Sequence, residues 1–187
     1  MNPDAERPES PFFDERGFSN NICTCVNDIA GPHYMSTYTL QSLERLKELC
    51  RISPEVMAES MMPGPIESLE DHRSGYFCVY EIYFKGSGLT FPLPEALVRY
   101  LKALGIALSQ LTPNLLRTIL DIITVAAEAR YAVGVLELNE LLSVRSSSKK
   151  AGYFSAYPNA NKNFISHLLN KEEKWHHPWF LIKKTPT

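Results

Sequence analysis

Several features that assign proteins to familiar functional classes are missing from this sequence of 187 residues. It contains no run of about 18 apolar residues, so we expect no membrane-spanning helix and no membrane partner. Residues Met1 to Ser10 lack the basic-then-apolar order of a signal peptide. The sequence therefore predicts an intracellular protein, and it does not distinguish the nucleus from the cytoplasm.

The four cysteines do not have the spacing of a metal site. Cys23 and Cys25 form a single Cys-x-Cys pair, and Cys50 and Cys78 stand alone. A structural zinc site usually takes its four ligands from two such pairs, or from one pair and two spaced histidines. We expect reduced thiols in a reducing compartment and no bound metal. Cys78 has no histidine partner in its aromatic stretch, so a small buried residue is expected there, not a nucleophile.

The sequence also lacks any group of residues with the spacing of a known catalytic site. The segment Gly86 to Gly88 lacks the lysine and the Ser/Thr of a phosphate-binding loop, and it predicts a turn. The neighbouring His176 and His177 have no third ligand at a set spacing and predict a surface loop. A two-metal nuclease needs clustered carboxylates, whereas the acidic residues of the predicted helices have ordinary surface spacings: Asp121, Glu128, Glu137 and Glu140. We expect no enzymatic activity, no catalytic residue and no cofactor.

The composition is that of a globular domain with a polar leader. Hydrophobic residues make up 44% of the chain and charged residues 21%, which is ordinary for a folded protein. Residues 1–36 are rich in Pro, Asp, Glu, Asn and Ser, and they predict a disordered leader. Residues 37–187 predict a single domain that is long enough to bury a core.

Apolar periodicity predicts helices over much of this domain. Thr39–Cys50 repeats leucine every three or four residues behind a capping threonine, and another helix begins at Ser53. A third helix follows Pro94 and ends at Gly105. The longest runs from Thr112 to Tyr131 and is apolar around most of its girth, which predicts a central position in a bundle. A last helix is expected over residues 135–144.

Strands are expected mainly near the end of the chain. Residues 152–157 and 179–183 are short, aromatic and β-branched, and we expect them to pair as an antiparallel ribbon. Residues 76–79 predict a short extended segment followed by a helical turn, in which Glu81 is partly buried and held by Arg99 or Arg117. The predicted fold class is mainly α: a helical bundle with a small C-terminal antiparallel β-ribbon.

The order of several short motifs resembles a known family. Tyr80-Glu81 and a short aromatic helix precede Gly88-Leu89 and Phe91-Pro-Leu93, and Leu104-Gly-Ile106, Gln110-Leu111 and Pro113-Asn114 follow. Gly152-Tyr-Phe-Ser155, Lys174-Trp175 and Trp179-Phe-Leu-Ile182 continue the series. This order resembles the plant gypsy-type transposon domain, named "transposase, gypsy type", of retrotransposon-derived proteins, from about Leu40 to Lys184. The order Lys174-Trp175 is reversed relative to that family.

The resemblance implies a transposable-element origin without the chemistry that the word transposase suggests. We expect a Gag-like or accessory protein that is not an enzyme and acts through protein–protein interaction. Its protein partner is not identified by the sequence, and self-association is open.

An uneven charge distribution supports one alternative function. From Arg145 to Thr187 there are eight Lys/Arg and two Asp/Glu, a net charge of +6. The preceding residues hold the other eleven Lys/Arg and nineteen Asp/Glu, a net charge of −8. Such an end can bind nucleic acid weakly and without sequence preference, with Tyr153, Tyr157 or Trp175 stacking on bases; a solvated polar surface is the simpler explanation. The candidate contacts are Lys149, Lys150, Lys162, Lys171, Lys174, Trp175, Lys183 and Lys184.

Overall fold

The computed structural model describes residues 36–50, 52, 60–64, 74–147, 152–158 and 175–183. The expected leader, apart from Ser36, lies outside these ranges, as does the helix expected to begin at Ser53. None of the helices formed by the described residues is long and apolar enough to cross a membrane.

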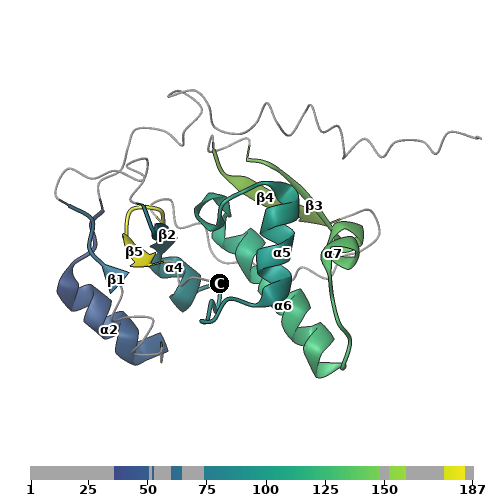
Figure 1. Cartoon of the computed structure of the whole chain (residues 1–187), viewed down its shortest axis with the longest axis horizontal. Helices are drawn as coiled ribbons and strands as arrows, with labels where there is room; N and C mark the ends of the chain where they lie inside the picture. The colour runs from purple at the N-terminus through teal and green to yellow at the C-terminus, as the bar shows by residue number, and fades with distance from the viewer. Residues whose placement is uncertain are drawn as a thin grey trace, which may run out of the picture.

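The described residues form an α+β fold, so the prediction of a mainly helical bundle is wrong (Figure 1). Of the strands that the described residues form, two lie between the first and the second of the described helices, and three follow the last helix. The elements in order are α2 (Leu40–Cys50), β1 (Ser60–Met61), β2 (Tyr76–Tyr80), α4 (Glu81–Lys85), α5 (Glu95–Leu104), the 3-10 helix η1 (Leu108–Gln110), α6 (Pro113–Glu128), α7 (Val135–Leu141), β3 (Leu142–Ser146), β4 (Phe154–Pro158) and β5 (Trp179–Lys183).

The strands form two separate antiparallel sheets. One sheet has the order β1-β5-β2, and the other pairs β3 with β4. In the first sheet Val79 lies opposite Phe180, and Met61 lies opposite Leu181 on the other side of β5. The two C-terminal strands were both expected, but they belong to different sheets. The predicted ribbon between residues 152–157 and 179–183 is therefore wrong.

The helix expected over residues 135–144 ends early because its last residues join a strand. Leu142 adopts φ −124° and ψ 135°, which is extended backbone. Ser143 and Val144 continue as β3 and pair with Tyr157 and Ala156 of β4. Pairing with a strand more than ten residues away outweighs the helical period here, and such long-range preference is not visible in a local pattern.

Local start and stop signals were predicted more accurately than pairing. Thr112 Oγ1 accepts a hydrogen bond from the Leu115 N–H at 3.4 Å, and Thr39 Oγ1 accepts one from the Ser42 N–H at 3.1 Å. Gly105 ends α5 with φ 66°, the left-handed conformation expected of it. The extended segment followed by a helical turn is confirmed as β2 and α4.

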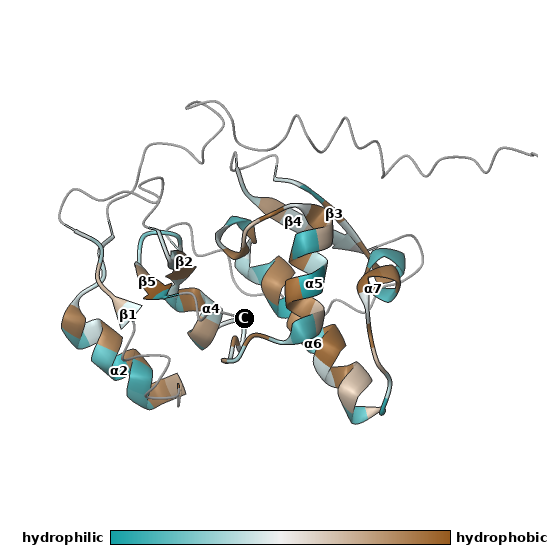
Figure 2. Ribbon diagram, in the orientation of Figure 1, coloured by the Kyte–Doolittle hydropathy of each residue, from teal (hydrophilic) through white to brown (hydrophobic). Residues whose placement is uncertain are grey.

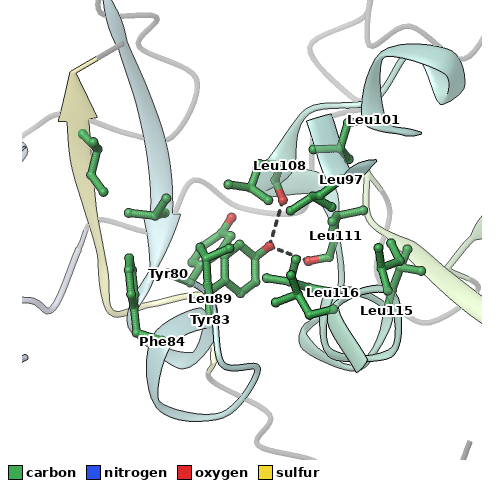
Figure 3. Close-up of a cluster of buried hydrophobic side chains, with 14 of the residues drawn as sticks. Tyr80, Tyr83, Phe84, Leu89, Leu97, Leu101, Leu108, Leu111, Leu115 and Leu116 are labelled. Carbon is green, nitrogen blue, oxygen red and sulfur yellow. Dashed lines mark hydrogen bonds between the residues drawn. The ribbon is translucent and has the colours of Figure 1, made fainter. Parts of the chain in front are cut away.

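The core is built around the first half of α6 and the aromatic residues of β2 and α4. Leu115, Leu116 and Ile119 are fully buried. Tyr83 is also fully buried, and its hydroxyl donates to the backbone carbonyls of Leu108 at 3.1 Å and of Leu111 at 2.5 Å (Figure 3). These bonds satisfy the phenol inside the core and fix η1 against α4.

The motifs that carry the family resemblance have structural roles. Gly88 has φ 73°, which lets the chain turn so that Leu89 is buried and its N–H bonds the Tyr83 carbonyl at 2.9 Å. Phe91 packs on Phe77 and Phe84, with ring centroids 6.3 and 6.0 Å apart. The resemblance therefore rests on residues that form turns and core contacts.

Two smaller expectations are corrected. The leucine stripe of α2 buries Leu43 and Leu46 only, because Leu40 and Leu49 are 68% and 65% exposed. Glu81 is held by neither Arg99 nor Arg117, because those arginines pair with Glu95 and Asp121, one turn away on their own helices. Glu81 pairs instead with Lys85 and accepts a hydrogen bond from the Tyr38 hydroxyl at 3.3 Å.

Candidate interaction surface

Only two of the predicted nucleic-acid contacts belong to the part of the chain that the structure describes. Lys183 is exposed at the end of β5, and Trp175 is partly buried. The other six lie outside the described residues: Lys149, Lys150, Lys162, Lys171, Lys174 and Lys184. That these lysines contact nucleic acid therefore stays a prediction.

Trp175 is a member of an aromatic cluster that joins the two sheets. Its ring meets those of Tyr80 and Tyr153 edge to face, each with a centroid distance of 5.0 Å, and it stacks near Tyr83 at 6.5 Å. Tyr153 is buried, so any stacking on a base falls to Tyr157 and to the accessible part of Trp175. Tyr157 is exposed, and the Arg145 guanidinium lies 5.7 Å from its ring centroid.

The polar atoms of this cluster are satisfied within the protein. The Tyr80 and Tyr153 hydroxyls share a hydrogen bond of 2.9 Å. Burial raises the pKa of Tyr80 and of Tyr83 well above the usual value for tyrosine. Both phenols therefore stay protonated near neutral pH and have no role as bases there.

His176 is buried, so the surface loop expected for the histidine pair is wrong at this position. Its ring lies 5.5 Å from Trp175 and 6.4 Å from Tyr153, measured between centroids. Trp175 is the preceding residue, but Tyr153 lies more than twenty residues away in the sequence, so the local pattern did not indicate this burial.

The acidic residues considered for catalysis lie exposed on the surface: Asp121, Glu128, Glu137 and Glu140. Asp121 lies 3.7 Å from the Arg117 guanidinium. Glu137 Oε2 accepts the Gly134 backbone N–H at 2.8 Å, and its bonds to backbone N–H groups, its own and that of Gly134, lower the pKa of its carboxyl group. Within the described ranges, no three His, Cys, Asp or Glu side chains gather to hold a metal ion. Because it accepts the Gly134 N–H, Glu137 caps the start of α7.

The second half of α6 leaves the core while it stays apolar. Ile122 and Ile123 are only partly buried, and Val125 is 63% exposed on the side opposite the buried face. Figure 2 shows hydrophobic residues on the part of α6 that extends past α5. A helix of 16 residues is about 24 Å long, whereas α5 beside it has 10 residues and spans about 15 Å. The end of α6 is therefore uncovered by α5.

A well-formed cap fixes the end of this helix. The Tyr131 N–H bonds the Ala126 carbonyl at 2.8 Å, and the Arg130 N–H bonds the Ala127 carbonyl at 3.0 Å. Together these two bonds make a Schellman motif, closed by Arg130 at φ 60° where glycine is the usual residue. The motif holds the Tyr131 backbone in one conformation, and the Tyr131 side chain is 76% exposed.

The segment that follows adds one more exposed apolar residue and several acidic ones. Leu136, in the first turn of α7, is 75% exposed. We name residues 122–136, with their exposed side chains Val125, Tyr131 and Leu136, the α6–α7 tip. From Asp121 to Glu140 the chain holds four acidic residues and one basic residue, Arg130, so the net charge of this stretch is −3. The tip itself holds one acidic and one basic residue, Glu128 and Arg130, and the other three acidic residues flank it at Asp121, Glu137 and Glu140.

Sequence reasoning missed this surface because it took the apolar girth of α6 as a sign of burial along the whole helix. The first half is buried as expected, but the stretch after Asp121 is not. Helix length was the available signal, since α6 was predicted to be the longest helix of the chain and the helices around it to be shorter.

Comparisons with known proteins find similarity to segments of longer plant proteins. No family model matches it, and no solved structure matches it. It is 27% identical over 146 residues to "Meiosis-specific protein ASY2" of Arabidopsis thaliana, covering 78% of this chain and 10% of that protein. It is also 27% identical over 152 residues to "Uncharacterized protein At3g60930, chloroplastic" of the same plant, covering 81% of this chain and 19% of that protein. The chain thus spans a tenth and about a fifth of the length of these curated relatives.

Proposed function

We propose that this chain is a protein-binding module without catalytic activity, and that the α6–α7 tip is its contact surface. The observation that carries the proposal is the exposure of Val125, Tyr131 and Leu136 within one short stretch of defined backbone. Single exposed apolar residues are common on any surface, so the argument rests on their grouping and on the fixed backbone that presents them.

The fixed backbone favours binding for an entropic reason. The Schellman motif at Arg130 and the bond from the Gly134 N–H to Glu137 hold both ends of the loop between α6 and α7. A surface that is already ordered loses less conformational entropy when a partner binds. Tyr131 also belongs to a residue type that is over-represented among the side chains that dominate binding energy.

The acidic residues on both sides of the tip indicate the chemistry of a partner. Because the stretch from Asp121 to Glu140 has a net charge of −3, a partner surface that combines an apolar patch with Lys or Arg residues fits it best. Such charges mainly increase the association rate and the selectivity, while burial of the apolar side chains supplies the affinity.

We also propose the transposable-element origin that the motif order implies. It is supported by the order of short motifs from about Leu40 to Lys184. The relatives are plant proteins, one of them named for meiosis, and their names do not speak to a Gag-like role. The binding proposal does not depend on that origin.

The tip proposal predicts a selective loss of binding. We expect the double variant Val125→Ser, Tyr131→Ser to keep the fold and to lose at least about tenfold in affinity for a partner, since two exposed apolar contacts are removed. Partners recovered by the wild-type chain from plant cells would be re-measured with purified proteins by calorimetry.

A matched control uses exposed apolar residues away from the tip. Leu40→Ser on α2 and Val98→Ser on α5 remove similar side chains and should leave binding unchanged. If the double variant bound every recovered partner as tightly as the wild-type chain does, the tip would not be the contact surface.

Weak nucleic-acid binding is the second proposal, and the +6 balance after Arg145 supports it. We expect affinity that falls steeply with salt and is not measurable at physiological ionic strength, because lysines bind by releasing counterions from phosphates. The test is a titration of single-stranded DNA at low and high salt. The matched variants are Lys183→Gln and Lys184→Gln, since truncation at Val144 would remove β4 and β5 from the fold. Tight binding that survives raised salt would contradict this account.

A further inference from the structure

Strands β3 and β4 place different side chains on the two faces of their small sheet. Leu142 and Val144 of β3 belong to the hydrophobic core. Because side chains alternate along a strand, Arg145 lies on the opposite face, directly across from Ser155 of β4. Tyr157, two residues further along β4, lies on that same face. This face, which we name the Arg145–Tyr157 face, therefore carries a cation, a hydroxyl group and an aromatic ring.

Arg145 is held in place without losing its charge. Its Nε donates to Ser143 Oγ at 3.1 Å, and its guanidinium lies 5.7 Å from the centroid of the Tyr157 ring. Arg99 and Arg117 each pair with an acidic residue one turn away on the same helix, but no carboxylate among the described residues pairs with Arg145. Arg145 is also exposed, so its remaining N–H donors are available to an anion.

Tyr157 supplies a flat ring next to this cation. It is 43% exposed, whereas Tyr153, four residues earlier, is buried and its ring meets that of Trp175 edge to face. An exposed tyrosine ring is a surface on which a nucleobase can stack, and an arginine beside the ring strengthens such binding. The ring and the guanidinium thus form one continuous contact surface.

The charge of the surrounding sequence favours a polyanion. From Leu142 to Pro158 the chain holds three basic residues, Arg145, Lys149 and Lys150, and no Asp or Glu, so the net charge is +3. An acidic peptide would match this charge but would make no use of the exposed ring. A strand of nucleic acid matches both, because it alternates phosphates with flat bases.

We propose that the Arg145–Tyr157 face binds single-stranded nucleic acid, with a base stacked on Tyr157 and the neighbouring phosphate bound by Arg145. This inference rests on the weak nucleic-acid binding proposed above and assigns it to one face of the protein. Ser155 is partly exposed and lies across from Arg145, so its hydroxyl can donate to the same phosphate.

The geometry also sets the kind of strand and the strength of binding. A duplex keeps its bases stacked on one another and offers no free base to Tyr157. Every base has a π-face, so stacking on a single ring gives little sequence preference. One ring and one guanidinium contact about one nucleotide, and the binding is therefore weak and sensitive to salt.

The first test compares two strands at low salt: an oligothymidylate of about 12 nucleotides and an abasic strand of the same length. Tyr157→Thr removes the ring but keeps a residue suited to a strand. We expect it to weaken binding of oligothymidylate about fivefold or more and to leave binding of the abasic strand unchanged, whereas Tyr157→Phe should bind both like the wild-type chain. Equal affinity of the wild-type chain for the two strands would mean that charge alone is recognised, as in an acidic peptide, and would overturn the proposal.

Arg145→Gln should act on the salt dependence instead. Loss of one phosphate contact is expected to lower the slope of log K against log salt by about 0.7, and Tyr157→Thr should not change that slope, because stacking releases no counterion. The matched controls are Arg99→Gln and Tyr131→Thr, which replace an exposed arginine and an exposed tyrosine elsewhere and should leave both affinity and slope unchanged. A slope unaffected by Arg145→Gln would overturn the proposal.

Ultraviolet cross-linking of the wild-type chain covers the case in which the substituted chains do not fold. Cross-links to oligothymidylate should map to Tyr157, and cross-links confined to other residues would overturn the proposal. Absence of binding to any strand at low salt would overturn the weak nucleic-acid proposal together with this one. Binding that neither the Tyr157→Thr nor the Arg145→Gln substitution changes would overturn this inference alone.

Discussion

Ile119→Asp is expected to unfold the domain. Ile119 is fully buried in the middle of the half of α6 that forms the core. The substitution removes a packed side chain and places a carboxylate in the hydrophobic core, and both effects destabilise the folded state. We expect the free energy of unfolding to fall by about 4 kcal/mol or more, a large part of the stability of a small domain. Urea denaturation followed by circular dichroism measures this.

The same helix supplies the control for this substitution. Val125 is also a β-branched residue of α6, but it is 63% exposed. Val125→Asp should change the free energy of unfolding by no more than about 0.5 kcal/mol, as is usual for surface substitutions. Equal destabilisation by the two variants would mean that the end of α6 is covered, and it would remove the basis of the proposed interaction surface.

The features that could be predicted from sequence are those set by neighbouring residues. Thr112 followed by Pro113 marks the start of α6, and Gly105 marks the end of α5, because capping depends on a few adjacent backbone groups. The sequence of short signals in residues 76–86 likewise predicted β2 and α4. These expectations needed no knowledge of what packs against the segment.

Strand partners could not be predicted because they join residues far apart in the chain. β5 lies between β1 and β2, so its neighbours precede it by about a hundred residues or more. The aromatic and β-branched composition of β5 indicates a strand but not which strand pairs with it. The nearest predicted strand, β4, was therefore assigned to it wrongly. Leu142 to Ser146 was missed for the same reason, since only β4 stabilises it as a strand.

The α6–α7 tip could not be recognised from single segments, because finding it requires knowing how the helices pack together. Val125, Tyr131 and Leu136 look like core residues when each is considered alone. Val125 is exposed because it lies on the side of α6 opposite the buried face, and Tyr131 is exposed where the Schellman motif at Arg130 ends the helix.

Phe180→Ala is expected to lower the free energy of unfolding by about 3 to 5 kcal/mol, the range for a buried aromatic residue replaced by alanine. Phe180 is fully buried in the middle strand of the first sheet, and its ring stacks on Tyr38 at 5.4 Å and on Phe84 at 5.8 Å. It thus joins β5 to the segment before α2 and to α4. Lys183→Ala, at an exposed position of the same strand, should have little effect in the same urea titration. A loss below about 1 kcal/mol for Phe180→Ala would indicate that β5 lies at the margin of the fold, as in the ribbon first expected from the sequence, and not between β1 and β2.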